Sequence, residues 1–272
     1  MPLPILLYHQ ITAAPNHANR VTIAPGEWPY RINKEAFDRQ MRWILQQQMR
    51  TVPIEQLINK PSPATSEAFL TCQCVCMTFD DGSMNHYDLA YPTLLSYGQR
   101  ATFFVITDRI GQRGYLSWEQ LREMAAHGMS IQSHSCSHSS LRHATRRQAR
   151  DELLNSKECL EQALGRRVTV FAAPAGTWHS DLSALAQDSG YQIVCTSEQG
   201  VNDKPLDLLA LKRLSIRGMY SMRRFQSLVV GRPLAILRQQ AEAFCFDSAK
   251  VLLGWNRYNA IRRYLLAQIT RS

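Results

Sequence analysis

Cys76-Met77-Thr78-Phe79-Asp80-Asp81-Gly82 is the stretch on which the interpretation of this sequence depends. It ends a segment, Leu70 to Phe79, whose Thr, Val, Cys and Phe residues are typical of a β-strand. Side chains alternate between the faces of a strand, so neighbouring aspartates at its end diverge unless the backbone turns, and Gly82 permits a turn. Carboxylates aimed in different directions suit a site where one binds a metal and the other accepts a proton. The alternative is an ordinary Asp-Asp-Gly turn.

A second strand-like segment, Gly128 to Ser133, leads into His134-Ser135-Cys136-Ser137-His138. This spacing lets both imidazoles converge on one side of a helical or tightly turned backbone. Two histidine nitrogens and one carboxylate form a three-ligand set that leaves a place for water on a Zn²⁺-like ion, the usual layout of a hydrolytic metal site. A single histidine is more often structural, but the pair together with Asp80-Asp81, each after a strand, favours a metal site.

Three motifs resemble, in order, the first three motifs of the polysaccharide deacetylases (the NodB-homology group, carbohydrate esterase family 4). They are Thr78-Phe79-Asp80-Asp81-Gly82, His134-Ser135-x-x-His138 and Phe171-Ala172-Ala173-Pro174-Ala175-Gly176. The resemblance extends from about Pro4 to about Phe225. It is specific, because several motifs recur in the right order with plausible spacing.

The resemblance implies a role for each motif residue. Asp80 is the general base, and Asp81, His134 and His138 hold Zn²⁺ or another divalent metal. The backbone N–H of Ala175, where the family has an aromatic residue, is one donor to the oxyanion. The implied activity is metal-dependent hydrolysis of N-acetyl or O-acetyl groups on a saccharide or polysaccharide precursor, as in exopolysaccharide biosynthesis. The implied partner is an acetylated amino-sugar glycan or a lipid-linked saccharide.

One departure from the family concerns the arginine that orients the base. The third motif usually begins with this arginine, and here the position is Ala172. Arg213, in Leu211-Lys212-Arg213-Leu214, is the candidate to replace it.

A second departure concerns the histidine that acts as the acid. In the family it usually lies in a Leu-x-His near the C-terminus, but no histidine follows His179 here. Leu7-Tyr8-His9 has this pattern at the other end of the chain, which resembles the circularly permuted poly-N-acetylglucosamine deacetylases. His9 is therefore the expected acid, with His179 as a rival. His17, His86 and His127 are expected on the surface.

Strand and helix patterns alternate along the chain, which favours a parallel sheet with helical crossovers. The resemblance implies an α/β fold, a distorted (β/α) barrel of about seven parallel strands, with residues 1–230 as the catalytic domain. In such barrels the functional groups lie at the carboxyl ends of the strands. Asn33 is expected to cap one helix, and the capping boxes Ser117-x-x-Gln120 and Thr145-x-x-Gln148 open two others. Strands are expected near residues 3–8, 70–79, 101–106, 129–133, 168–172, 192–196 and 213–216.

After Met219 the pattern is helical only, and apolar residues alternate with Arg and Lys. We treat residues 231–272 as a basic amphipathic helical extension. One interpretation is a helical cap packed on the barrel. The other is a surface that lies on anionic lipid.

Composition limits the remaining possibilities. With 272 residues, 45% of them hydrophobic, the chain is long enough for one large core. The net charge of +9 favours anionic partners, but no motif indicates nucleic acid. The seven cysteines form no Cys-x-x-Cys pair and are expected to be reduced. The N-terminal apolar run is too short for a signal peptide and no segment has the length of a membrane span, so we expect the cytoplasm, or a peripheral position at the inner membrane face.

Two other functional classes stay open. One is an inactive relative that only binds glycan, against which the unaltered Asp80, Asp81, His134 and His138 argue. The other is a metal-dependent hydrolase of another non-peptide C–N bond, such as that of a small or cyclic amide.

Overall fold

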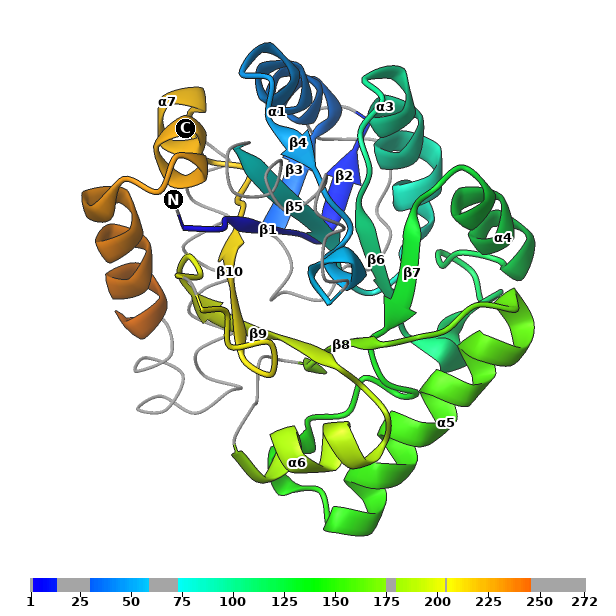
Figure 1. The fold of residues 1–272 in the computed structure, drawn as a ribbon. Coiled ribbons are helices and arrows are strands. Elements are labelled where there is room, and N and C mark those ends of the chain that lie inside the picture. The colour runs from blue at the N-terminus through cyan, green and yellow to red at the C-terminus, as the bar shows by residue number, and fades with distance from the viewer. Residues whose placement is uncertain (1, 14–29, 59–72, 175–179, 204, 246–272) are drawn as a thin grey trace, which may run out of the picture.

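A computed structural model describes residues 2–13, 30–58, 73–174, 180–203 and 205–245. Its central feature is a closed ring of parallel strands with helices around it (Figure 1). The first strand of the chain closes the ring, because it pairs in parallel with the strands on both of its sides. The expected NodB-like (β/α) barrel of seven parallel strands is confirmed. In ring order the strands are β1 (Ile5–Tyr8), β10 (Leu211–Ser215), β9 (Ile193–Gln199), β8 (Val170–Ala172), β7 (Ser130–Ser133), β6 (Thr102–Val105) and β5 (Cys74–Phe79).

Helices lie around the outside of this ring (Figure 1). A short strand, β4, pairs with β5, while β2 and β3 form a separate parallel pair. These additional strands are β4 (Arg50–Thr51), β2 (Gln10–Thr12) and β3 (Arg31–Asn33). The helices are α1 (Lys34–Gln46), α3 (Tyr91–Ser96), α4 (Trp118–Ala126), α5 (Arg146–Leu164), α6 (Ser180–Asp188) and α7 (Met222–Val229). Single 3₁₀ turns span Ile54–Leu57, Thr107–Arg109 and Leu141–His143, and a π-helical turn spans His86–Ala90.

The predicted helix caps are present. The Asn33 side chain accepts hydrogen bonds from the first backbone amides of α1, at 2.8 and 3.3 Å. Both capping boxes are complete, at Ser117 and Gln120 before α4 and at Thr145 and Gln148 before α5. These interactions satisfy amides that have no partner within the helix, so they fix where each helix begins from local sequence alone.

Alternation along β5 and β10 separates two apolar clusters. On β5, Val75, Met77 and Phe79 pack outward against the helices, while Cys76 belongs to a smaller cluster with Phe104 and Leu211. Because side chains alternate, the face that carries Cys76 continues to Asp80, and the face that carries Leu211 continues to Arg213. The barrel interior is therefore apolar around Cys76 and Leu211, and becomes polar at Asp80 and Arg213, toward the carboxyl ends of the strands. Within the described part of the chain the cysteines form no disulfide with one another, and their reduced state stays a prediction.

The first part of the C-terminal extension is a helix packed on the barrel. In helical residues 233–245, the Gln239 and Gln240 side chains donate to backbone carbonyls of β10 and β9, at 2.8 and 2.9 Å. Glu242 accepts from Arg224 of α7 at 2.7 Å. One face of this part therefore packs on the barrel as a cap does, while Leu234, Leu237 and Phe244 remain exposed. Residues 246–272 lie outside the described residues, and the division of the chain at residue 230 stays a prediction.

Within the described ranges, no helix has the length and apolarity needed to cross a membrane.

Candidate active site

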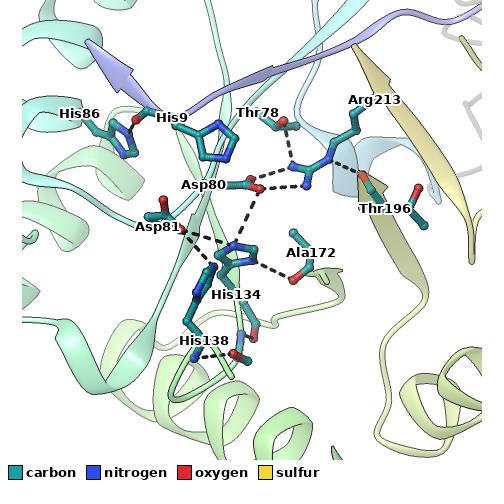
Figure 2. Close-up of polar contacts among 12 residues, drawn as sticks. His9, Thr78, Asp80, Asp81, His86, His134, His138, Ala172, Thr196 and Arg213 are labelled. Carbon is teal, nitrogen blue, oxygen red and sulfur yellow. Dashed lines mark hydrogen bonds and ion pairs between the residues drawn. The ribbon is translucent and has the colours of Figure 1, made fainter. Parts of the chain in front are cut away.

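Asp80 and His9 lie side by side because β1 and β5 pair in register. Tyr8 is opposite Phe79 in this pair, and the backbone N–H of Asp80 donates to the Tyr8 carbonyl at 3.0 Å. His9 follows Tyr8 directly, so it emerges at the same rim of the barrel. Figure 2 shows its ring pointing toward the Asp80 carboxylate. The Nδ1 atom of His9 is buried and has no hydrogen-bond partner in the described part of the chain.

Arg213 holds the Asp80 side chain from inside the barrel. Its Nη1 and Nη2 atoms donate to Oδ1 and Oδ2 of Asp80 at 2.7 and 2.8 Å, a bidentate pair (Figure 2). Its Nε atom donates to the carbonyl of Thr196 at 2.8 Å, and Nη1 also contacts the hydroxyl of Thr78 at 3.3 Å. The Arg213 side chain is fully buried. The residue expected to replace the missing arginine is thus positioned to orient Asp80.

The charge of Arg213 decides the protonation state of Asp80. Burial by itself raises the pKa of Asp80, which is 3% exposed. The positive charge of Arg213 and its hydrogen bonds outweigh burial and hold this pKa well below the usual range. Asp80 is therefore ionised at every physiological pH.

Asp81 faces away from Arg213 because the chain turns sharply after β5. Asp81 itself has a φ of 79°, and Gly82 follows with a φ of 69°. A Cβ at Gly82 would lie 3.0 Å from Cγ1 of Val105, and the left-handed φ would strain any side chain there, so both the conformation and the space favour glycine. The two adjacent carboxylates diverge as expected, but the left-handed turn begins at Asp81, one residue earlier than the glycine.

His134 is fixed by its position at the end of β7. Its backbone N–H donates to Val105 at 2.9 Å, and its Nδ1 lies 2.8 Å from the carbonyl oxygen of Ala172 on β8. A carbonyl only accepts, so Nδ1 carries the proton and Nε2 presents its lone pair to the site. Burial lowers the pKa of His134 to about 4, although Asp80 opposes this shift. The ring is therefore neutral, as a metal ligand must be.

His138 reaches the site through a tight loop rather than a helix. Ser135 and His138 have left-handed φ values of 65° and 64°. Such conformations cost on the order of 1–3 kcal/mol each for residues other than glycine, so the surrounding structure must hold them. The His138 side chain is 29% exposed, and burial lowers its pKa as well.

The carboxylate of Asp81 and the rings of His134 and His138 come together with their donor atoms facing one another (Figure 2). Asp81 Oδ1 lies 3.6 Å from His134 Nε2 and 3.4 Å from His138 Nε2. Donors bound to one zinc ion at about 2.0–2.1 Å in a tetrahedral arrangement lie about 3.3 Å apart. Two neutral imidazole nitrogens and one carboxylate oxygen at these separations fit a divalent ion of the zinc type. Asp80 lies beside this set, with Oδ2 at 3.8 Å from His134 Nε2.

The expectation that His86 lies on the surface is wrong, because its side chain is fully buried. Its Nε2 atom donates to the backbone carbonyl of His9 (Figure 2). Its ring contacts those of Phe79 and Phe103 at centroid distances of 5.4 and 5.8 Å. Burial lowers the pKa of His86 to about 4. Its burial depends on β1, which comes much earlier in the chain, so no local sequence pattern indicates it.

Two expected site residues, Ala175 and the rival acid His179, lie outside the described residues. The proposed oxyanion donor stays a prediction for this reason. His127 is exposed, as expected.

A closed parallel barrel with carboxylates and imidazoles gathered at the carboxyl ends of its strands has the architecture of a barrel enzyme. The family model described as polysaccharide deacetylase matches residues 70–194. YxkH of Bacillus subtilis (strain 168), whose name assigns it to the polysaccharide deacetylases, is 32% identical over 216 residues, which are 79% of this chain and 71% of that protein. The chain belongs to the polysaccharide deacetylase family, whose members are hydrolases of carbon–nitrogen bonds other than peptide bonds.

Solved structures agree with this assignment. The Streptococcus pyogenes deacetylase PplD, solved in complex with acetate, is 26% identical, with a TM-score of 0.69 over 85% of this chain and 98% of that one. IcaB from Ammonifex degensii is 23% identical, with a TM-score of 0.67 over 84% of this chain and 96% of that one. The second likeness concerns the fold alone.

Proposed function

We propose that this protein removes N-acetyl groups from a saccharide or polysaccharide precursor with the help of a divalent ion, most simply Zn²⁺. The observation that carries the proposal is the position of Asp80, locked by Arg213, beside the ligand set of Asp81, His134 and His138. A lone ligand set would support metal binding only. A set with an ionised carboxylate next to it supports hydrolysis, because the same site then holds a proton acceptor.

The substrate is proposed to be attacked by water at the acetyl carbonyl carbon. An ion bound by the three ligands would polarise the carbonyl and lower the pKa of water. Asp80 accepts the proton of the attacking water. Because its pKa is held low, Asp80 is a weak base but stays ionised and can accept a proton at physiological pH. Arg213 keeps both of its oxygens in fixed positions. The Ala175 amide remains our proposed donor to the oxyanion.

The leaving amine needs a proton, for which we propose His9. The ring lies at the same rim as Asp80, and its buried Nδ1 has no partner within the described residues. The carbonyl of His9 is held by His86, which limits how far the residue moves. A group on the other side of the base from the metal ligands is suited to protonate the nitrogen as the C–N bond breaks (Figure 2).

The proposed partner is an acetylated amino-sugar glycan or a lipid-linked saccharide.

A second proposed contact is with an anionic membrane surface. The net charge of +9 favours an anionic partner, and Leu234, Leu237 and Phe244 are 82%, 60% and 73% exposed on helical residues 233–245. This exposed apolar row supports peripheral contact with an anionic membrane. Sedimentation with anionic liposomes should pellet the protein at low salt and less at high salt, and L234E/L237E should reduce pelleting. If L234E/L237E pellets with the liposomes as well as the wild type does, this apolar row does not contact the membrane. The cellular location stays a prediction.

A metal analysis combined with an acetate-release screen tests the main proposal. The purified protein should contain one divalent ion and release acetate from N-acetylated oligosaccharides, while H134A/H138A should lose both. Ring opening of small cyclic amides without acetate release would favour the other C–N hydrolase class. Saccharide binding without either reaction, by metal-loaded protein, would favour an inactive glycan-binding relative.

A further inference from the structure

The loop that carries His138 is held by an unusual series of contacts. Each backbone amide from Ser135 to Ser139 donates to a side-chain oxygen. Three of the acceptors are hydroxyl oxygens of serines in the same segment, at 3.1–3.2 Å. The amide of residue 135 donates to Ser133, the amide of residue 138 to Ser135, and the amide of residue 139 to Ser137. The amides of residues 136 and 137 have a different partner, which comes from another element.

That partner is Glu152 of α5. Its Oε2 atom accepts from the amides of Cys136 and Ser137 at 2.9 and 3.0 Å. Its Oε1 atom accepts from the Ser137 hydroxyl at 2.5 Å. Both oxygens are thus used by the loop, and among the described residues no cation lies within ion-pair distance of this carboxylate. Glu152 is therefore the acceptor that ties the loop to a rigid helix.

The two histidines depend on this loop to different extents. His134 is 2% exposed and bonded through both its backbone and its ring to neighbouring strands. His138 is bonded through its amide to Ser135, and its ring contacts the His134 ring at 4.9 Å. Its approach to Asp81 therefore depends on the loop keeping two left-handed residues. Such a conformation persists only where the surroundings over-determine it.

We propose that Glu152 is a positioning residue of the metal centre, which holds the 134–138 loop in the conformation that brings His138 to Asp81 and His134. The inference rests on the proposed metal centre and assigns a further residue to it. Glu152 touches neither the metal ligands' donor atoms nor the base. It acts through the loop backbone, in the way that hydrogen-bonded groups behind metal ligands orient them.

Zinc affinity, measured by competition with a chromophoric chelator on the full chain, tests this role without relying on catalysis. E152A should weaken Zn²⁺ binding about 10–100-fold, the usual effect of losing a group that orients a ligand. E152Q keeps an acceptor for the two amides and should recover most of the affinity. If E152A does not fold, E152Q compared with E152L in the soluble fraction gives the same contrast.

Glu161 provides a matched control on the same helix. Its carboxylate also accepts from a loop amide, that of Val168 at 2.9 Å, and from Lys157 at 2.8 Å, but away from the His134–His138 loop. E161A should lower the melting temperature and leave the zinc affinity unchanged. An equal loss of zinc affinity in E161A and E152A would show a general effect of destabilising α5 and overturn the positioning role.

A double-mutant cycle with His138 tests whether Glu152 affects zinc affinity through His138. If Glu152 acts through His138, E152A should have no further effect on zinc affinity in the H138A background. An undiminished effect in that background would overturn the proposal. If wild-type protein binds Zn²⁺ no more tightly than H134A/H138A, the metal centre itself is wrong, and this inference with it. If wild-type binding depends on these histidines and E152A binds equally well, only the role of Glu152 is wrong.

Discussion

Arg213 and Asp80 lie 133 residues apart in the sequence and form a bidentate pair inside the barrel, at 2.7 and 2.8 Å. Both side chains are buried, and the third donor direction of Arg213 is used by the Thr196 carbonyl. A buried pair of this kind is held in one geometry, since neither partner has another way to satisfy its charge. The orientation of Asp80 is therefore set by β10, although Asp80 itself belongs to the end of β5.

Removing Arg213 should destabilise the protein. R213M leaves the Asp80 carboxylate buried without its partner, which typically costs about 3–5 kcal/mol. Chemical denaturation of metal-free protein at neutral pH measures this loss. The double variant D80N/R213M should recover a large part of it, because no buried charge remains. A double variant that is as unstable as R213M would show that packing, rather than charge, accounts for the loss.

R213M should also change how activity depends on pH in the acid range. Asp80 has a lowered pKa in the folded state, so its ionisation contributes stability above its unfolded pKa of 3.8, and this is lost as the pH falls through the folded value. In R213M the largest of the contributions that offset burial is absent, so the pKa of Asp80 should rise. The acid limb of the pH–rate profile should therefore move to higher pH than in the wild type. An unchanged acid limb would assign that limb to another group.

Asp80→Asn should separate the base from the ligand set. We expect this variant to keep its metal, because the three donor atoms belong to Asp81, His134 and His138. The rate of acetate release should fall by a factor on the order of 10²–10⁴, as for other lost general bases. Asp81→Asn is the matched comparison, since it should lose metal and activity together. Turnover near the wild-type rate in Asp80→Asn would remove Asp80 from the mechanism.

His9→Ala should keep the metal and bind substrate almost normally, yet lose kcat. The reason is that His9 lies beside Asp80 and outside the ligand set. If it supplies the proton to the leaving amine, the alkaline limb of the pH–rate profile should change in this variant. Activity in His9→Ala together with inactivity in His179→Ala would transfer the acid role to His179 and contradict the circularly permuted arrangement of the acid.

His86 should make the metal-free protein sensitive to mild acid. Burial lowers its pKa from 6.5 to about 4, so the unfolded chain binds a proton that the folded protein excludes between these values. Stability should thus be highest above pH 6.5 and fall toward pH 4, with a share from His86 of about 3 kcal/mol. His86→Phe should remove this share from the pH dependence of the unfolding free energy. Equal slopes in His86→Phe and the wild type would contradict the prediction.

The strand and helix order could be predicted from sequence because its signals are local. The cap at Asn33 and the capping boxes before α4 and α5 involve residues three positions apart, and the alternation along β5 is a property of one strand. The candidate ligands were found for the same reason, since each motif ends a strand of a barrel whose carboxyl ends meet at one rim. The burial of His86 could not be predicted because it comes from contacts with His9, with Phe79 of β5 and with Phe103 of β6.

By itself, the sequence determined which groups are available: two adjacent aspartates at a strand end, two histidines with a spacing of four, an arginine in one apolar strand and a histidine at the end of another. Tertiary structure decided which of them meet. Closure of the ring by β1 brings His9 beside Asp80, and the inward face of β10 brings Arg213 to the same carboxylate. Likewise, packing of α5 against the barrel brings Glu152 under the His138 loop. The physical reason is that local sequence sets the period and ends of an element, whereas contacts between elements depend on strand register and on which faces the barrel encloses.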